Sequence, residues 1–161
     1  MLHYAADDLM RYANLRHAMS GPGALSEDPL DRNPTTTCIS LCDDRLVLRR
    51  EPTPDDLRPG PLWAGPSLLS YVDNAGWMMT IAHLPPGSDA LTIDLYIKFL
   101  RPAPFADLIA DTRLLRMSKR KADLDIIVRS VEIADGPVAH ATATFAPRPA
   151  TTHTSPSAQP R

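Results

Sequence analysis

The chain has 161 residues, 43% of them hydrophobic, and a formal net charge of −2. This length suits one domain, and the nearly balanced charge gives no overall basic field that would attract nucleic acid or an anionic membrane. Its two cysteines, Cys38 and Cys42, are too few for a disulfide framework, and their spacing is not that of a metal or redox pair. We therefore expect a reduced, cytoplasmic protein that needs no metal or redox cofactor.

The first residues predict an amphipathic helix rather than an export signal. Apolar residues recur among charges from residue 4 to about residue 18, and the sequence SGPG then stops the helix. Asp7 and Asp8 stand where a signal peptide would have its apolar stretch. Residues 1–34 are therefore predicted to form a helix and a loop, and short β segments follow over TTTCISL and RLVLRRE.

The segment GPSLLSYVDNAGWMMTIAHL predicts a helix that begins near Gly65 and is covered on most sides. Pro66 stands at the first helical position, where its missing N–H would have had no partner. The segment is short for a bilayer and carries a carboxylate, Asp73, in its middle, so a buried helix fits better than a membrane span. Pro85-Pro86-Gly87 ends it.

The rest of the chain predicts antiparallel strands over residues 90–100, 107–117, 122–133 and 137–147. In the first strand, alternation predicts that Leu91, Ile93, Leu95, Ile97 and Phe99 face the core while Thr92 lies on the opposite face. In the last strand, Ala139, Ala141, Ala143 and Phe145 share a face on which small side chains would let a helix approach closely. Residues 148–161 contain no large apolar residue and predict a disordered tail.

One helix and one long antiparallel sheet predict a small α+β domain over residues 35–147. A single sheet of this size wraps only part of a helix. The remaining apolar surface and the unpaired edge strand are most simply covered by a second copy of the chain, which predicts a homodimer.

The segments LSYVDNAG, ALTIDLYIKFLRPAP and VAHATATF, in this order, resemble the hotdog-fold acyl-CoA thioesterases of the phenylacetate-pathway (PaaI-like) type. The resemblance runs from about residue 45 to residue 147. It implies a hotdog fold, in which a long antiparallel sheet wraps around a central helix, here with an extra N-terminal helix. It also implies that two protomers join their sheets, that the sites lie at the dimer interface, and that dimers can pair into tetramers.

The same resemblance implies the catalytic residues. The family starts its helix with His-Gly-Gly and carries a carboxylate after a short apolar run, and the equivalent residues here are Ala64-Gly65-Pro66 and Asp73. Asp73 would act as base or nucleophile, and the Gly65 N–H would be the oxyanion donor at the positive end of the helix. Thr92 matches a later Asp or Ser/Thr position and would hold the attacking water from the partner chain. The structural alternative for Asp73 is a carboxylate paired with a neighbour such as Arg101 or reaching solvent.

The residues that would contact the substrate follow less directly from the resemblance. Arg101 and the turn residues Lys119 and Arg120 offer basic groups for the phosphates of CoA, although charged turns are usually just solvated. Tyr71, Asn74 and Trp77 are candidates for the acyl pocket, although core packing is the more frequent role of such residues. Aryl-acetyl, medium-chain and branched acyl groups all remain open.

The sequence therefore predicts an acyl-CoA thioesterase in which CoA is part of the substrate. One alternative is an acyl-CoA binding or sensing protein without turnover, because Ala64 replaces the family histidine. A hotdog hydratase or dehydratase is weaker, since those enzymes usually pair an acidic residue with a histidine. A serine hydrolase is disfavoured because Leu69 stands where the second glycine of G-x-S-x-G should be.

Overall fold

The computed structural model describes residues 2–3, 5–8 and 36–148. Residues 6–8 are helical. The rest of the predicted N-terminal helix, the loop after it and the predicted tail from residue 149 onward lie outside the described residues.

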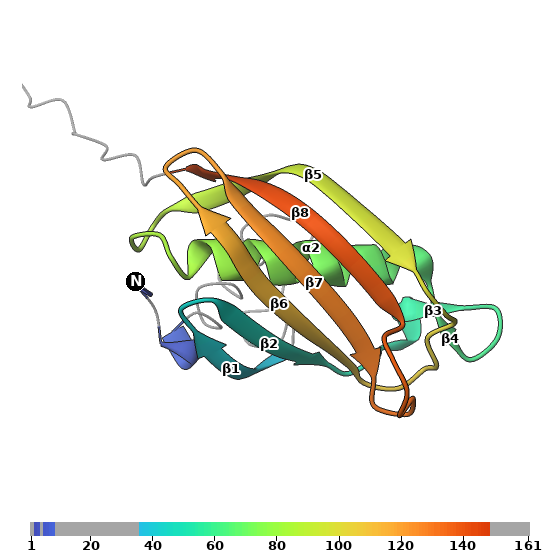
Figure 1. The fold of residues 1–161 in the computed structure, drawn as a ribbon. Coiled ribbons are helices and arrows are strands. Elements are labelled where there is room, and N and C mark those ends of the chain that lie inside the picture. Colours follow the sequence, from blue (N-terminus) through green and yellow to red (C-terminus); the bar gives the residue numbers. More distant parts are fainter. Residues whose placement is uncertain (1, 4, 9–35, 149–161) are drawn as a thin grey trace, which may run out of the picture.

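One six-stranded antiparallel sheet dominates the described part of the chain, with the strand order β1-β2-β6-β7-β8-β5 (Figure 1). A short 3₁₀ helix, η2 (Pro54–Asp56), and a two-stranded hairpin, β3 (Leu57–Arg58) with β4 (Leu62–Trp63), lie between β2 and the main helix in the sequence. The strands of the large sheet are β1 (Thr36–Cys42), β2 (Arg45–Arg50), β5 (Asp89–Phe99), β6 (Leu108–Met117), β7 (Ala122–Ser130) and β8 (Ala139–Arg148).

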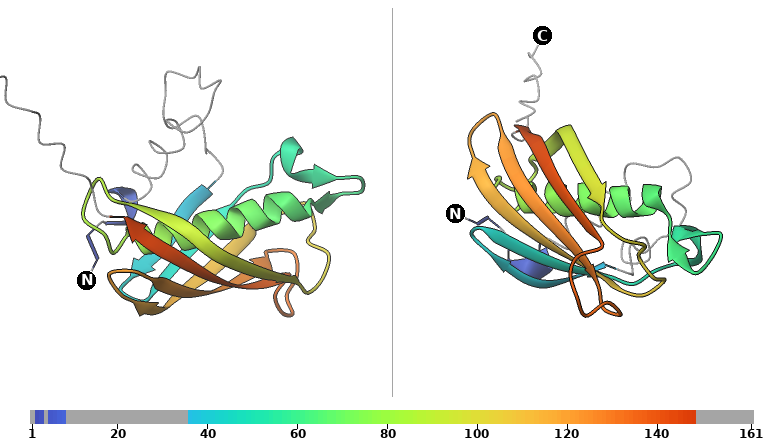
Figure 2. Two further views of the ribbon diagram at one scale, coloured as in Figure 1. Left: turned by 90° about the horizontal axis from the view of Figure 1, so that it is seen from above. Right: turned by 45° about the vertical axis from the view of Figure 1, so that its right-hand side comes forward.

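The main helix, α2 (Gly65–Ile81), begins where the sequence predicts and ends three residues earlier than the predicted Leu84. Ala64 is the residue that caps its start, in extended conformation, and Pro66 lies in its first turn. The sheet curves around α2 and covers it from one side (Figure 2). A long antiparallel sheet wrapped around one central helix is the hotdog fold, so the predicted fold is confirmed.

Alternating side chains of β6, β7 and β8 form the core against α2. The four predicted inward residues of β8, Ala139, Ala141, Ala143 and Phe145, are all buried. The small size of the three alanines lets the helix backbone approach the sheet, and at Gly76 an added Cβ would lie 2.6 Å from Phe145 Cε2. The glycine and the alanines are therefore needed for this close packing.

Strand β5 departs from the predicted alternation. A β-bulge interrupts its pairing with β8 between Thr92 and Asp94, so that Thr92 lies opposite Phe145, on the face that points to the helix. Leu91 and Ile93, predicted to face the core, are 49% and 51% exposed. The physical reason is that a bulge adds one residue to the strand. Every side chain that precedes the bulge therefore points to the opposite face of the sheet from the one that simple alternation predicts.

The position of β5 at the edge of the sheet also affects the exposure of Phe99, its C-terminal residue. Phe99, another residue predicted to face the core, is 53% exposed, since β5 has a neighbouring strand on only one side in the part of the chain that the structure describes. No helix among the residues described in the structure is long and apolar enough to cross a membrane.

Candidate active site

One side of α2 is not covered by the sheet. Leu69 and Ser70 are exposed there, and Asp73, Asn74 and Trp77 are half-buried, whereas the residues between them are buried. Their spacing of three or four residues places them on one side of the helix. We call these five residues the exposed stripe of α2.

Asp73 lies in the middle of the exposed stripe and is held by Thr92. The Thr92 hydroxyl donates a hydrogen bond to Asp73 Oδ1 at 2.8 Å, within the same chain. The bulge in β5 makes this contact possible because it turns Thr92 toward the helix. Arg101, the neighbour that sequence reasoning offered as an ion-pair partner, instead donates to the backbone carbonyl of Asp135. Within the described residues no cation pairs with Asp73, so its second oxygen is left for a ligand or water.

Gly65 is the first residue of α2. Like the other first N–H groups of a helix, its N–H has no intrahelical acceptor, and no other hydrogen bond to it forms within the described residues. The aligned peptide dipoles of α2 make this end of the helix electropositive. Among the described residues, an added Cβ at Gly65 would meet Phe99 Cζ at 3.8 Å, an ordinary contact distance, so there is room for a small side chain at this position.

A groove of about 480 Å³ runs beside the first turn of α2. Arg58 and Arg101 are its charged lining residues, and the others are glycine or apolar: Leu62, Trp63, Gly65, Leu68, Phe99, Leu100, Pro102 and Ala103. Sequence reasoning missed Arg58, since no periodicity marks it and only the β3–β4 hairpin brings it back beside Gly65. The groove therefore combines an apolar surface, two guanidinium groups and the start of the helix.

Asp73 does not line this groove. It lies eight residues beyond Gly65, which corresponds to about 12 Å along the helix axis. Within one chain the unpaired N–H and the carboxylate are therefore separate features.

Lys119 and Arg120 lie far from Arg101. They occupy the turn between β6 and β7, at the opposite end of the sheet from the start of α2 (Figure 1). The ten residues of β6 separate the two ends by about 30 Å. Within one chain, Arg101 and the turn residues Lys119 and Arg120 are therefore not brought together, and their contact with CoA stays a prediction.

Tyr71 belongs to the core rather than to the site. It is completely buried, and its hydroxyl lies 2.9 Å from the carbonyl oxygen of Leu48, to which it donates, and accepts from the Ala110 N–H at 3.2 Å. Burial raises the pKa of Tyr71 well above its usual range. The prediction that Tyr71 contacts substrate is corrected accordingly, because nothing outside the protein can reach it.

Asn74 and Trp77 do lie on the exposed stripe, both on the C-terminal side of Asp73. The Trp77 indole N–H donates to Asp89 Oδ1 at 3.0 Å, which fixes its ring beside the start of β5. Asn74 Nδ2 lies 3.8 Å from Met78 Sδ. Within the described residues no three His, Cys, Asp or Glu side chains lie where they could hold a metal ion.

Comparison with known proteins gives two kinds of match. The family model of the thioesterase superfamily matches residues 62–136. No curated protein matches the chain. Among solved structures, a candidate thioesterase from Silicibacter sp. TM1040 has a TM-score of 0.75 and 25% identity, over 92% of this chain and 95% of that one.

Two other solved structures share the fold at lower identity. A thioesterase from Haemophilus influenzae has a TM-score of 0.72 and 13% identity, over 96% of this chain and 99% of its own. A hypothetical thioesterase from Streptococcus pneumoniae TIGR4, solved with coenzyme A, has a TM-score of 0.65 and 16% identity, over 75% of this chain and 91% of its own.

Proposed function

We propose that this protein is an acyl-CoA thioesterase, because both its family-model match and its fold resemble the hotdog-fold thioesterase superfamily. The comparisons support thioester hydrolysis in general, and the phenylacetate-pathway type is part of the proposal. The substrate class is a small or medium acyl-CoA or aryl-acyl-CoA, which is split into the free acid and CoA. One observation carries the proposal: Asp73 stands on the uncovered side of a largely buried helix with one oxygen bound to Thr92 and no cation paired to it within the described residues.

Asp73 can serve the reaction in two ways. As a nucleophile, its free oxygen adds to the thioester carbonyl, the C–S bond breaks, CoA leaves as the thiolate, and water then hydrolyses the acyl-aspartate anhydride. As a general base, it takes a proton from water while the water oxygen adds to the carbonyl, and the C–S bond breaks in the same way. In both routes the hydrogen bond from Thr92 would orient the carboxylate. The role that the resemblance implies for Thr92, holding the attacking water from the partner chain, stays a prediction.

The negative charge that develops on the carbonyl oxygen needs a donor within hydrogen-bonding distance. The Gly65 N–H is suited to this role because it is unpaired within the described residues and stands at the positive end of α2. Pro66 has no N–H to offer. Because Gly65 and Asp73 of one chain are separated by about 12 Å along the helix, they can act on the same carbonyl only when they belong to two different copies.

The exposed edge of the sheet supports such a pairing. Among the described strands, β5 is hydrogen-bonded only to β8, and it carries exposed apolar side chains at Leu91, Ile93, Tyr96 and Phe99. An unpaired edge with apolar side chains is a surface that a second copy can cover. We therefore propose a homodimer with two shared sites, which can pair further into a tetramer.

The groove beside Gly65 suits the CoA part of the substrate. Its apolar lining can pack against the pantetheine chain, and the guanidinium groups of Arg58 and Arg101 can bind phosphate. Lys119 and Arg120 could contact the same CoA only from the second copy, because they lie at the other end of the sheet. A cytoplasmic location and the absence of a separate cofactor remain predictions.

A second function is favoured by one feature of the site. Ala64, in place of the family histidine, provides no side-chain hydrogen bond at the start of α2. A protein that binds or senses acyl-CoA without turnover would keep the groove and lose the reaction.

Release of free CoA thiol from a panel of aryl and straight-chain acyl-CoAs tests the proposal, with wild type and Asp73→Asn side by side. The thioesterase proposal predicts turnover by wild type that collapses in Asp73→Asn. Tight binding of a non-hydrolysable acyl-CoA analogue, with no thiol released from any substrate, would instead support the binding protein. Turnover at an equal rate by both proteins would rule out a catalytic role for Asp73.

A further inference from the structure

A largely buried ion pair lies next to the start of α2. Arg50 Nη2 donates to Asp56 Oδ1 at 2.7 Å, and Asp56 is only 3% exposed. The second carboxylate oxygen of Asp56 accepts from the Thr53 N–H at 3.0 Å and from the Thr53 hydroxyl at 2.9 Å. Both oxygens of this carboxylate are therefore fixed in position.

The guanidinium of Arg50 is fixed in turn by two aromatic rings. It lies 5.4 Å from the ring centre of Trp63 and 5.8 Å from that of Tyr71. The Tyr71 ring is itself held by the hydrogen bonds of its hydroxyl to the backbone of the sheet. Arg50 thus connects the sheet, the helix and the segment before the helix.

Backbone hydrogen bonds connect this ion pair to the start of α2. The Asp56 carbonyl oxygen accepts a hydrogen bond from the Ala64 N–H at 2.7 Å, and the Trp63 N–H donates to the Ala103 carbonyl at 3.0 Å. Ala64 immediately precedes Gly65. The position of Asp56 therefore fixes Ala64, and through Ala64 it fixes the peptide unit that carries the Gly65 N–H.

Two arguments point to positioning rather than stability as the purpose of this pair. A buried ion pair is weak support for stability, because an apolar pair of the same volume is often as stable. In addition, alanine is a poor residue to cap a helix, since it has no side-chain oxygen to accept from the first N–H groups. The helix start is here held from outside, through the backbone carbonyl of Asp56.

We propose that Arg50 and Asp56 are positioning residues that hold the Gly65 N–H where it can bind the oxyanion of the reaction. This inference depends on the proposed function for the role of Gly65, and it adds two residues that touch neither Asp73 nor the groove.

Asp56→Asn tests the inference in the full-length protein. Loss of the charge releases Arg50, so we expect kcat to fall about tenfold, because a small displacement of an oxyanion donor weakens only transition-state binding. KM should change less than about twofold, since ground-state binding is not affected. Hydrogen exchange of the Ala64 N–H, followed by NMR, should become at least about tenfold faster as its acceptor loses its fixed place.

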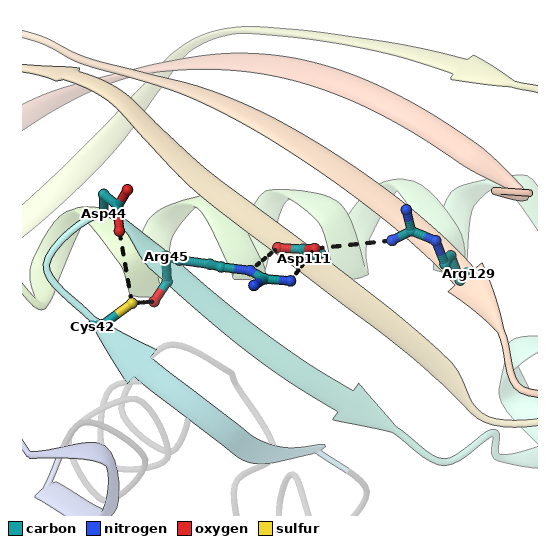
Figure 3. Close-up of polar contacts among 5 residues, drawn as sticks. All are labelled: Cys42, Asp44, Arg45, Asp111 and Arg129. Carbon is teal, nitrogen blue, oxygen red and sulfur yellow. Dashed lines mark hydrogen bonds and ion pairs between the residues drawn. The ribbon is translucent and has the colours of Figure 1, made fainter.

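A matched control lies on the opposite face of the sheet. Arg45 donates to both oxygens of Asp111 at 2.8 and 2.7 Å, and Arg129 lies 3.9 Å from the same carboxylate (Figure 3). This network has the same chemistry as the Arg50–Asp56 pair and no connection to the start of α2. Asp111→Asn should therefore keep the wild-type kcat and the wild-type exchange of the Ala64 N–H.

Arg50→Lys is the second variant, because it keeps a positive charge and the folded core if Asp56→Asn does not fold. It cannot form the same planar contact with Asp56, so the same split between kcat and KM is expected. Faster Ala64 exchange with an unchanged kcat in an active enzyme would overturn the inference, and so would unchanged exchange in both folded variants. If wild type hydrolyses no acyl-CoA, the proposed function fails on its own, and faster exchange would then leave only a structural role for the pair.

Discussion

The two sides of α2 differ in how their polar groups are hydrogen-bonded. On the side that faces the sheet, Tyr71 and Thr80 are completely buried, and their hydroxyls bond to backbone groups at 2.9 Å. On the exposed stripe, Leu69 is 39% exposed, and Asp73 keeps an oxygen that no group in the described residues binds. One helix of 17 residues therefore both packs in the core of the fold and carries the candidate site.

This difference gives a rule for substitutions. A change on the covered side should reduce the free energy of unfolding and leave the kcat of the folded protein unchanged. A change on the exposed stripe or at the free helix start should reduce kcat and leave the stability nearly unchanged. The predictions below test this rule, from the largest expected effect to the smallest.

Asp73→Asn should lower kcat about a thousandfold, because the amide can still accept from Thr92 but can neither attack the thioester nor take a proton. Thermal unfolding should be nearly unchanged, since the site is at the surface. Asp44→Asn is the control: it is an exposed aspartate in the turn between β1 and β2, at the other edge of the sheet from β5, and should keep full activity. A large loss of stability in Asp73→Asn would mean that the carboxylate serves the core, against the rule.

Gly65→Pro should lower kcat about a hundredfold, because proline removes the N–H at the first residue of the helix, where a proline is tolerated. Ala64 already has the extended conformation that precedes a proline, at φ −72° and ψ 142°. Gly65→Ala keeps the N–H and adds a Cβ at an ordinary contact distance from Phe99, so it should remain active. Equal activity of these two variants would exclude the Gly65 N–H as the oxyanion donor.

Gly76→Ala, on the covered side, should lower the free energy of unfolding by about 1–3 kcal/mol. The reason is the contact of 2.6 Å that the new Cβ would make with Phe145. Chemical denaturation measures the effect, and kcat per folded molecule should not change. A stable Gly76→Ala protein with reduced kcat would contradict the assignment of this side to the core.

Thr92→Val should lower kcat about tenfold, because it removes one hydrogen bond to a charged carboxylate and keeps the shape of the side chain. The control is Thr144→Val, which removes a similar hydrogen bond to Asp123, 3.1 Å long, on the other face of the sheet. Only Thr92→Val should affect activity. A normal kcat in Thr92→Val would mean that Asp73 needs no orientation from β5.

The smallest effect concerns the pH dependence of stability. Burial raises the pKa of Tyr71 in the folded state, whereas a tyrosine in the unfolded chain ionises near pH ~10. Above that pH the unfolded state releases a proton that the folded state keeps, so stability falls as pH rises, by up to about 1.4 kcal/mol per pH unit. Denaturation of wild type and Tyr71→Phe between pH 8 and 11 should show a shallower decline in the variant, and parallel curves would contradict it.

The fold was largely predictable from the sequence, for local reasons. Pro66 and Pro85 mark the limits of the helix region, and strict alternation marks the strands of the sheet. The bulge at Ile93 was not predictable, because the apolar and polar residues of ALTIDLYIKFL alternate without interruption through it. The contact between Thr92 and Asp73 depends on that bulge, so sequence reasoning could propose both residues but not their hydrogen bond.

Other parts of the site depend on long-range contacts that no spacing reveals. Tyr71 has an apolar ring and a polar hydroxyl, and only the position of the strands decides that it is buried. Arg58 comes beside Gly65 through a hairpin of very short strands, which leaves little pattern in the sequence. The distance between Arg101 and the turn at Lys119 follows from the strand order, which local periodicity does not determine.

The central claim is that each site takes its carboxylate from one copy and its oxyanion donor from the other. Purified mixed dimers of Asp73→Asn and Gly65→Pro subunits, carrying different affinity tags, test it most directly. If the claim holds, one of the two sites in each mixed dimer contains no defect, and kcat should recover to about half the wild-type value although each parent variant is nearly inactive. Mixed dimers as inactive as their parents would mean that both groups must come from the same chain, which contradicts the account.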